Sequence, residues 1–297
     1  MSRLQHILEQ GQFALTAEIT PPASSDLADL LAKAAPLKGL ADAVNVTDGA
    51  GARAHLESTV AAGVLLQNGI EPILQLTCRD RNRIALQSQL LGAAALGIKN
   101  LLLLKGDDPT KGDQPEAKAV FDLDSASLAA TAVEMRDHGR LPHGRAIGGS
   151  ADFFVGVADA PIDPPPGWRP ASLIKKVESG AQFAQTQFCM DADIVRRYVA
   201  RLVDSGLRGK LHLLVGVAPL ASAKSARWIK SQLGGSIIPD RFVERLDRAR
   251  DPAVEGRAIC IDFVKQLREI AGVGGAHIMA PLNEAAIVEV IEALRAA

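Results

Sequence analysis

The sequence has few cysteines, no excess of either charge and no long hydrophobic run. Its three cysteines, Cys78, Cys189 and Cys260, are far apart and form no C-x-x-C pair, which argues against a disulfide framework or a structural zinc site. Lysine and arginine total 33 against 34 aspartates and glutamates, so no positive excess indicates a nucleic acid or an anionic membrane as partner.

The longest apolar runs are also too short for a membrane protein. None reaches the roughly 18 to 20 residues that span a bilayer, and the N-terminal region lacks the apolar core of a signal peptide. The six histidines show no metal-ligand spacing, so we propose no metal site. We therefore expect a soluble protein of the reducing cytoplasm that binds neither nucleic acid nor membrane.

Short apolar runs rich in Val, Ile and Leu recur along the chain and alternate with longer segments in which apolar residues return every three or four positions. The first pattern predicts strands and the second predicts helices. The eight predicted strands are residues 13–19, 42–48, 71–77, 100–106, 152–158, 182–188, 211–217 and 275–281.

This alternation predicts a parallel sheet with a helix after each strand. Eight such units in 297 residues fit a single-domain (βα)8 barrel spanning residues 1–297 better than an open doubly wound sheet. An open sheet would usually carry a glycine phosphate loop after its first strand, but here that strand ends in "EITPP". The cluster "GVGGAH" from Gly272 follows a helix and precedes a strand, so we interpret it as a helix C-cap.

In such barrels the reactive groups lie at the C-terminal ends of the strands. Each polar residue there can also be an ordinary solvated loop residue, so only the set carries weight. The candidates are Glu18, Thr47, Asp48, Gln75, Thr77, Asp107, Asp108, Asp159 and Gln187.

Glu18 stands out because it interrupts an apolar strand just before the pair Pro21 and Pro22. A barrel interior is usually filled by apolar side chains, so a carboxyl group there can serve as a general acid. The alternative is an ion pair with a lysine or arginine inside the barrel mouth. For His277, which lies in an apolar strand, a hydrogen-bonded core position is the more frequent role.

Seven segments at and after the strand ends form one ordered set: "AEITPP", "VNVTDGA", "LQLTCRD", "LLLLKGDDPTKGD", "FVGVADAP", "KKVESGAQFAQTQFCMD" and "LLVGVAPLASAKSARWI". Together they resemble the methylenetetrahydrofolate reductase family, flavoproteins that reduce 5,10-methylenetetrahydrofolate to 5-methyltetrahydrofolate. The resemblance covers nearly the whole chain in order, and "AKAVFDLDSASL" is similar to a bacterial branch. It implies a catalytic barrel without the regulatory extension of larger relatives, acting in one-carbon and methionine metabolism.

The resemblance also implies roles for individual residues. Glu18 matches the proposed general acid, and Asp107 matches a catalytic aspartate that stabilises positive charge beside the flavin. Gln187 and Phe188 match substrate-binding positions. The positions implied to contact the cofactor are Thr47, Asp48, Gln75, Lys105, Gly106, Asp107, Ala158 and Lys176.

Two departures bear on the cofactor. Gln75 stands where a histidine is familiar, and Ala160 stands where an aromatic residue is expected before Pro161. The resemblance implies FAD as the cofactor, and these departures keep FMN as an alternative. It also implies NADH or NADPH as the electron donor. Two other readings stay open: a related barrel flavin enzyme with another donor or one-carbon carrier, and a non-catalytic folate-binding barrel. Assembly into a homo-oligomer also stays open.

Overall fold

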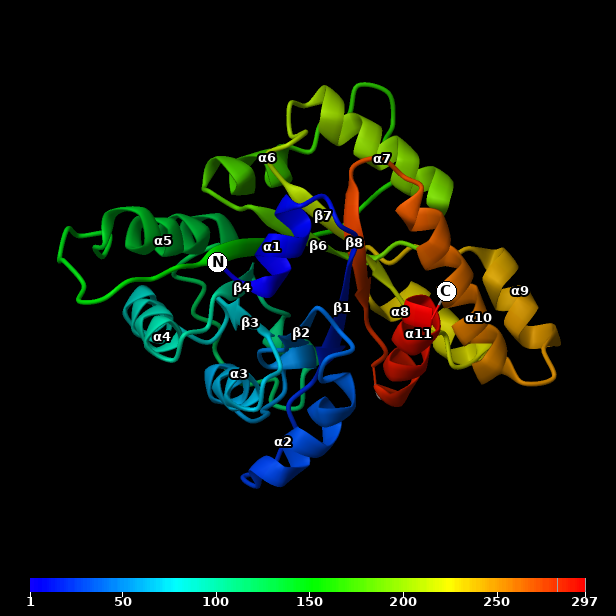
Figure 1. The fold of residues 1–297 in the computed structure, drawn as a ribbon, viewed down its shortest axis with the longest axis horizontal. Coiled ribbons are helices and arrows are strands. Elements are labelled where there is room, and N and C mark those ends of the chain that lie inside the picture. Colours follow the sequence, from blue (N-terminus) through cyan, green and yellow to red (C-terminus); the bar gives the residue numbers. More distant parts are fainter. Residues whose placement is uncertain (282, 297) are drawn as a thin grey trace.

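The structure, a computed structural model, describes residues 1–281 and 283–296. Eight parallel strands close into a barrel in chain order, so the predicted (βα)8 fold is confirmed (Figure 1). The strands are β1 (Ala14–Ile19), β2 (Ala43–Val46), β3 (Pro72–Thr77), β4 (Asn100–Leu104), β5 (Phe154–Asp159), β6 (Phe183–Phe188), β7 (His212–Val217) and β8 (Val273–Ile278).

Helices follow the strands around this barrel, as the alternation predicts. They are α1 (Arg3–Glu9), α2 (Leu27–Ala34), α3 (Ser58–Gln67), α4 (Arg83–Ala95), α5 (Ser125–His138), α6 (Ala171–Glu178), α7 (Ala192–Asp204), α8 (Ala223–Gln232), α9 (Asp240–Arg248), α10 (Pro252–Arg268) and α11 (Ala285–Ala296). Three short 3-10 helices, η1 (Ala35–Leu37), η2 (Ala50–Ala52) and η3 (Pro109–Lys111), lie in connecting segments.

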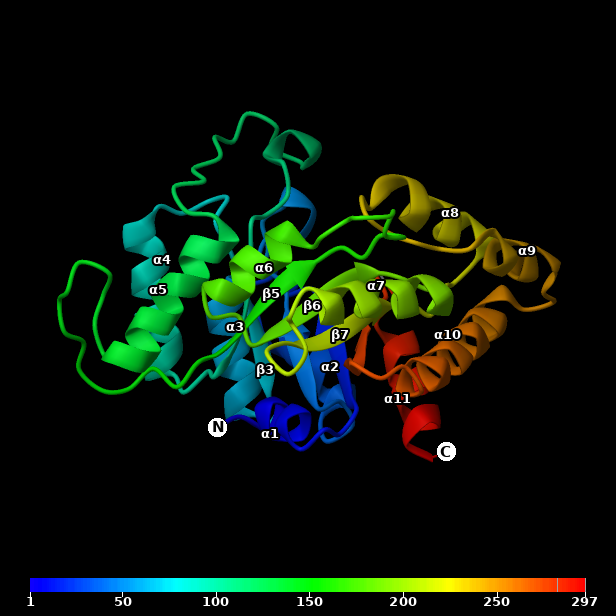
Figure 2. The same ribbon diagram turned by 90° about the horizontal axis from the view of Figure 1, so that it is seen from above.

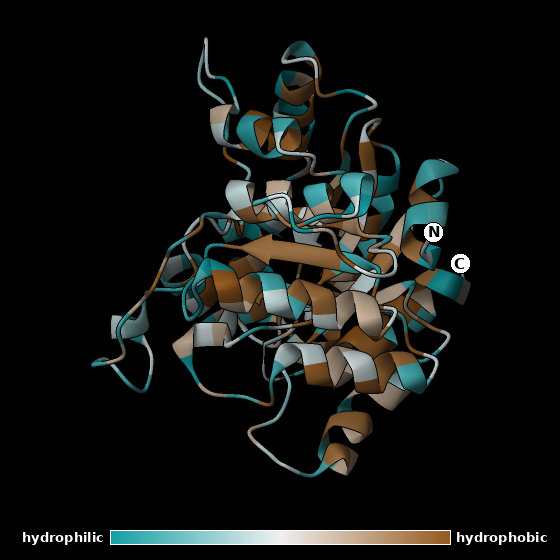
Figure 3. Cartoon of the chain, turned by 90° about the vertical axis from the view of Figure 1, so that its left-hand side faces the viewer, coloured by the Kyte–Doolittle hydropathy of each residue, from teal (hydrophilic) through white to brown (hydrophobic). Residues whose placement is uncertain are grey.

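The main hydrophobic core lies between the barrel and the helices. Alternate strand residues such as Val44, Leu74, Val155 and Val215 point into it and are fully or almost fully buried. Figure 3 shows hydrophobic strand segments inside and mixed hydropathy on the outer helices. Because both faces of a parallel strand are covered, the strands read as continuous apolar runs.

A second cluster fills the N-terminal end of the barrel interior. Leu4 and Leu8 of α1 pack there against strand residues that include Phe154 and Phe183. The Phe183 ring occupies the space beside Gly156, where an added Cβ would lie 2.2 Å from Phe183 Cζ. Figure 2 shows α1 and the N-terminus at this end, and the loop after β4 at the opposite end.

Glu71 holds α1 over the N-terminal end of the barrel. Its carboxylate accepts hydrogen bonds from the backbone N–H groups of Arg3 and Leu4, both at 2.8 Å. Asn100 Nδ2 donates to the same side chain at 2.9 Å. The first turn of a helix has unpaired N–H groups, and Glu71 satisfies two of them from a distant part of the chain. With this end closed, the C-terminal strand ends are the accessible face.

The last strand differs from its prediction. It begins at Val273 rather than 275 and ends at Ile278, and α10 ends at Arg268 with Glu269 as its C-cap. The interpretation of "GVGGAH" as a helix C-cap was therefore wrong. Gly275 lies inside β8, where an added Cβ would lie 2.5 Å from the Ala14 carbonyl oxygen, so close strand packing requires glycine there.

Candidate active site

Glu18 and Gln75 meet at the C-terminal end of the barrel interior. Gln75 Nε2 donates a 2.9 Å hydrogen bond to Glu18 Oε2. The Glu18 side chain is 22% exposed, so it is partly buried yet open at the strand ends. Among the described residues no lysine or arginine pairs with it, so the alternative of an ion pair with a basic side chain is not what the fold builds.

A buried polar layer lies below Glu18, where the sequence led us to expect apolar side chains. Asn45 Nδ2 donates to Gln185 Oε1 at 2.6 Å, and Gln185 Nε2 donates back to Asn45 Oδ1 at 3.1 Å. Thr16 Oγ1 lies 3.0 Å from His277 Nδ1. All four side chains are at most 3% exposed. The missed signal was a polar residue at an inward position of four strands.

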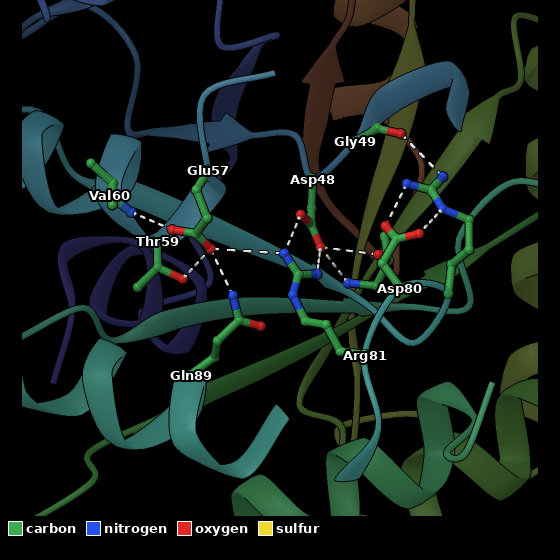
Figure 4. Close-up of polar contacts among 10 residues, drawn as sticks. Asp48, Gly49, Glu57, Thr59, Val60, Asp80, Arg81 and Gln89 are labelled. Carbon is green, nitrogen blue, oxygen red and sulfur yellow. Dashed lines mark hydrogen bonds and ion pairs between the residues drawn. The ribbon is translucent and has the colours of Figure 1, made fainter. Parts of the chain in front are cut away.

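The loop after β2 is held by a buried ion pair (Figure 4). Arg81 donates to both carboxylate oxygens of Asp48, at 2.6 and 3.0 Å. Thr77 donates to Asp48 Oδ2 from its backbone N–H at 2.8 Å and from its hydroxyl at 3.0 Å. Burial would lower the pKa of Arg81, but the hydrogen bond and the charge of Asp48 raise it overall. Both oxygens of the Asp48 carboxylate therefore have partners within the protein, and its contact with a cofactor stays a prediction.

Arg79 is a buried arginine in the same region, and nothing in its sequence context singled it out. Its side chain is 5% exposed and pairs with Asp80 at 2.7 Å. Its Nη1 also donates to the Gly49 carbonyl oxygen at 3.2 Å. Arg79 thus joins the end of β3 to the loop after β2.

Asp107 lies in the exposed loop after β4, and its side chain contacts the loop after β2. Its Oδ2 accepts a 3.0 Å hydrogen bond from the Gly51 backbone N–H. Gly106 has φ +96°, and an added Cβ would lie 2.8 Å from Arg79 Cβ. Only glycine allows the chain to turn at position 106 so close to the end of β3. The neighbouring Lys105 is exposed, and its Nζ lies 5.4 Å from the centroid of the Phe121 ring.

Asp108 has a local structural role, consistent with its interpretation as a loop charge. Its side chain accepts a 3.0 Å hydrogen bond from the Thr110 backbone N–H and caps η3. That hydrogen bond is the main reason why its pKa is lowered.

Lys176 is held at the end of β5. Its Nζ donates to the Ala158 carbonyl oxygen at 2.6 Å, so it is not a freely solvated helix lysine. Burial lowers its pKa, opposed by the charge of Asp159. Burial also disfavours the charged form of Asp159 and so raises its pKa. The Asp159 carboxylate accepts a hydrogen bond from the Tyr198 hydroxyl. A lysine and an aspartate thus share a partly buried region beside the strand ends.

The two residues expected to bind substrate face different ways. Gln187 is partly buried, and its Oε1 accepts a hydrogen bond from the Phe188 backbone N–H at 3.0 Å. Phe188 is 1% exposed and belongs to the core between barrel and helices. Its side chain is therefore not in the barrel interior with Gln185, and the structure does not bring it to Glu18.

Two further observations limit other sites. Adjoining surface hollows near Val199, Val203 and Ala271 lie between α7 and the turn before β8, and contain none of the candidate residues. Across residues 1–281 and 283–296, no three histidines, cysteines or acidic residues are grouped to hold a metal ion, and no helix is both long and apolar enough to cross a membrane.

The fold and these residues define a (βα)8 barrel with a partly buried carboxyl group and a polar layer at the open end of its strands. A sequence model of methylenetetrahydrofolate reductase matches residues 3–295. The chain therefore belongs to the methylenetetrahydrofolate reductase family, a family of oxidoreductases.

Individual relatives agree with this assignment. The 5,10-methylenetetrahydrofolate reductase of Salmonella typhimurium is 29% identical over 270 residues, which cover 87% of this chain and 83% of the relative. That of Escherichia coli is 27% identical over the same shares of both chains. A protein from Caenorhabditis elegans described as a probable methylenetetrahydrofolate reductase (NADPH) is 25% identical, and the match covers 80% of this chain but 34% of that one.

A solved structure from Clostridium thermocellum matches with a TM-score of 0.68 and covers 99% of both chains at 12% identity. Its description says that it binds two copies of 5-methyl-5,6,7,8-tetrahydrofolic acid. At this identity the likeness supports the barrel fold alone.

Proposed function

We propose that this protein reduces 5,10-methylenetetrahydrofolate to 5-methyltetrahydrofolate, with a flavin as cofactor and NADH or NADPH as donor. The observation that carries the proposal is Glu18, a partly buried carboxyl group held by Gln75 at the open end of the barrel. Family membership supplies the substrate class. A cytoplasmic location and a role in methionine synthesis belong to the same proposal.

Glu18 would supply the proton that this reduction needs. Opening the five-membered ring of the substrate makes one nitrogen a leaving group, and a proton on that nitrogen makes its departure easier. The O–H bond of Glu18 breaks, an N–H bond forms, and the methylene carbon becomes a cationic iminium. A bound reduced flavin supplies the hydride that this carbon accepts.

The strand ends offer groups that suit a flavin. Thr47, just after β2, is 5% exposed and its Oγ1 is buried without a hydrogen-bond partner among the described residues. A buried hydroxyl of this kind usually has a partner, and a flavin ring atom could be one. Lys176 is suited to a phosphate. The other residues that we propose to contact the cofactor are Asp48, Gln75, Lys105, Gly106, Asp107 and Ala158.

Asp107 and Gln187 complete the proposed site. Asp107 would place negative charge near the developing iminium, which a fixed carboxylate stabilises. Gln187 has an amide group whose NH2 has no partner among the described residues, and such a group can read the edge of a pterin ring.

A half-reaction experiment tests the whole proposal. We expect purified protein to be yellow, to bleach when NADH or NADPH is added without oxygen, and to regain its colour when 5,10-methylenetetrahydrofolate is added. If the protein is colourless but still forms methyltetrahydrofolate, the proposed folate reduction would stand and the proposed flavin cofactor would be wrong. Bleached protein that methylenetetrahydrofolate does not reoxidise would point to another carrier or to a non-catalytic role.

A further inference from the structure

A buried histidine lies against the proposed acid. His277 is on β8 and is 2% exposed, and its Nε2 is 3.5 Å from Glu18 Oε2. Gln75 Nε2 approaches the same oxygen at 2.9 Å. Glu18 Oε1, in contrast, has no hydrogen-bond partner among residues 1–281 and 283–296. The two carboxylate oxygens therefore have different surroundings.

The contacts of His277 in the polar layer favour hydrogen on one of its two ring nitrogens. Thr16 Oγ1 lies 3.0 Å from His277 Nδ1, and Gln185 Nε2 lies 3.5 Å from it. The Gln185 amide nitrogen can only donate, whereas the Thr16 hydroxyl, which also lies 3.4 Å from the Ala276 carbonyl oxygen, can donate or accept. A ring nitrogen that faces an amide N–H acts as an acceptor, so we assign the hydrogen to Nε2, which faces Glu18.

The orientation of Gln185 is itself fixed. Its amide pairs reciprocally with the Asn45 amide, with distances of 2.6 and 3.1 Å. This pair turns Gln185 Nε2 toward Thr16 and His277. The hydrogen bonds that link Asn45, Gln185 and Thr16 therefore orient the imidazole through its Nδ1 edge.

We propose that His277 is a positioning residue for Glu18, which together with Gln75 holds Oε2 and leaves Oε1 to face the substrate. The proposal rests on the proposed function, because it assumes that Glu18 is the acid. Since Oε2 faces two donors, the acidic hydrogen is carried on Oε1, where it can be transferred. The Nε2 to Oε2 distance is longer than an ordinary hydrogen bond, and such contacts often shorten when substrate binds.

Two amide substitutions separate the two edges of the ring. In His277→Gln the new amide nitrogen can take the place of Nε2 and still donate to Glu18. In His277→Asn the shorter amide can take the place of Nδ1 and contact Thr16, but it cannot reach Glu18. We expect His277→Asn to slow single-turnover reduction of methylenetetrahydrofolate by about 10- to 100-fold, because it loses one hydrogen bond to the carboxylate that forms as Glu18 gives up its proton. His277→Gln should recover most of that rate, and neither change should slow reduction by NADH.

A double-mutant cycle tests whether His277 acts through Glu18. In a Glu18→Gln background, His277→Asn should change the remaining rate by about twofold or less, because the group that it positions is absent. An undiminished effect there, or equal rates for His277→Asn and His277→Gln, would overturn the proposal. If His277→Asn does not fold, Thr16→Val removes the hydroxyl beside Nδ1 and should slow the same step.

A spectroscopic test does not depend on activity. Nitrogen-15 NMR of protein labelled at its six histidines, with the His277 signals identified by their loss in His277→Gln, should show a neutral ring with hydrogen on Nε2. Those signals should shift in Glu18→Gln. Hydrogen on Nδ1, or no shift, would refute the positioning role. Wild-type protein that shows these signals but does not act on methylenetetrahydrofolate would instead refute the proposed function.

Discussion

Arg81 binds both carboxylate oxygens of Asp48, and the two side chains are 17% and 6% exposed. The pair joins the loop after β2 to the segment after β3, two strand ends that border the proposed site. Removing one member of such a buried pair leaves an uncompensated charge.

We therefore expect Asp48→Asn to destabilise the protein by about 3 to 5 kcal/mol. Urea unfolding measures this directly. The matched control is Asp48→Asn combined with Arg81→Met, which removes the stranded charge and should recover part of the loss. A change below about 1 kcal/mol in the single variant would place the pair among weak surface interactions.

Glu18→Gln tests proton delivery. The amide keeps the shape of the side chain but cannot donate an acidic proton, so folate reduction should fall by about 10²- to 10⁴-fold. Cofactor content and reduction by NADH should stay near the wild-type values, because only the second half-reaction needs ring opening. Unchanged reoxidation of the reduced variant by methylenetetrahydrofolate would end the assignment of Glu18 as the acid.

Gln187→Ala tests recognition of the pterin. Loss of the amide should raise the apparent KM for folate by a factor that corresponds to about 1 to 3 kcal/mol, with little effect on the NADH half-reaction. Steady-state kinetics with each substrate varied in turn provide the measurement. Phe188→Leu is a useful comparison, because its side chain lies in the outer core and should affect thermal stability rather than KM. Equal damage to both half-reactions by Gln187→Ala would indicate a structural role.

The cysteines should be unreactive in the folded protein. Cys78, Cys189 and Cys260 are all 0% exposed. Burial raises the pKa of Cys78 to about 11 and that of Cys189 to about 12, and it raises the pKa of Cys260 as well. Because the thiolate is the reactive form, a disulfide reagent at pH 8 should label no thiol in native protein and three after denaturation. Rapid labelling of a native thiol would contradict this packing.

The alternation of apolar runs was enough to predict the barrel, because the eight strands and their helices are local patterns. Strand alternation also carried information that we did not use. Phe183, Gln185 and Gln187 are two residues apart, so Phe188 must point the other way, into the outer core. The same alternation placed polar groups such as Thr16 and Gln185 inside the barrel.

Pairings between distant residues could not be predicted in this way. Asn45 and Gln185 are 140 positions apart, and nothing local to either identifies the other as its partner. Asp48 looked like a free carboxylate after a strand until Arg81, 33 positions later, was found to bind it. The sequence indicates which polar groups lie near the strand ends, but the fold decides which of them are already paired.

The electrostatic role proposed for Asp107 can be tested by two substitutions. Its carboxylate accepts a hydrogen bond from the Gly51 backbone N–H, and an asparagine oxygen can accept the same bond. Asp107→Asn therefore removes the charge while keeping the contact between the loops, whereas Asp107→Ala removes both. Comparing these two variants separates electrostatics from loop structure.

A carboxylate beside the flavin and the pterin should have two opposing effects. It stabilises the cationic iminium, but it repels the negative charge of a reduced flavin, and both effects are stronger in a partly dehydrated site than in water. We therefore expect Asp107→Asn to have a more positive flavin midpoint potential and slower single-turnover reduction of methylenetetrahydrofolate. Loss of cofactor or of stability would not produce this combination. If the potential is unchanged and reoxidation is as fast as in the wild type, Asp107 only joins two loops, and the charge that stabilises the iminium must come from another residue.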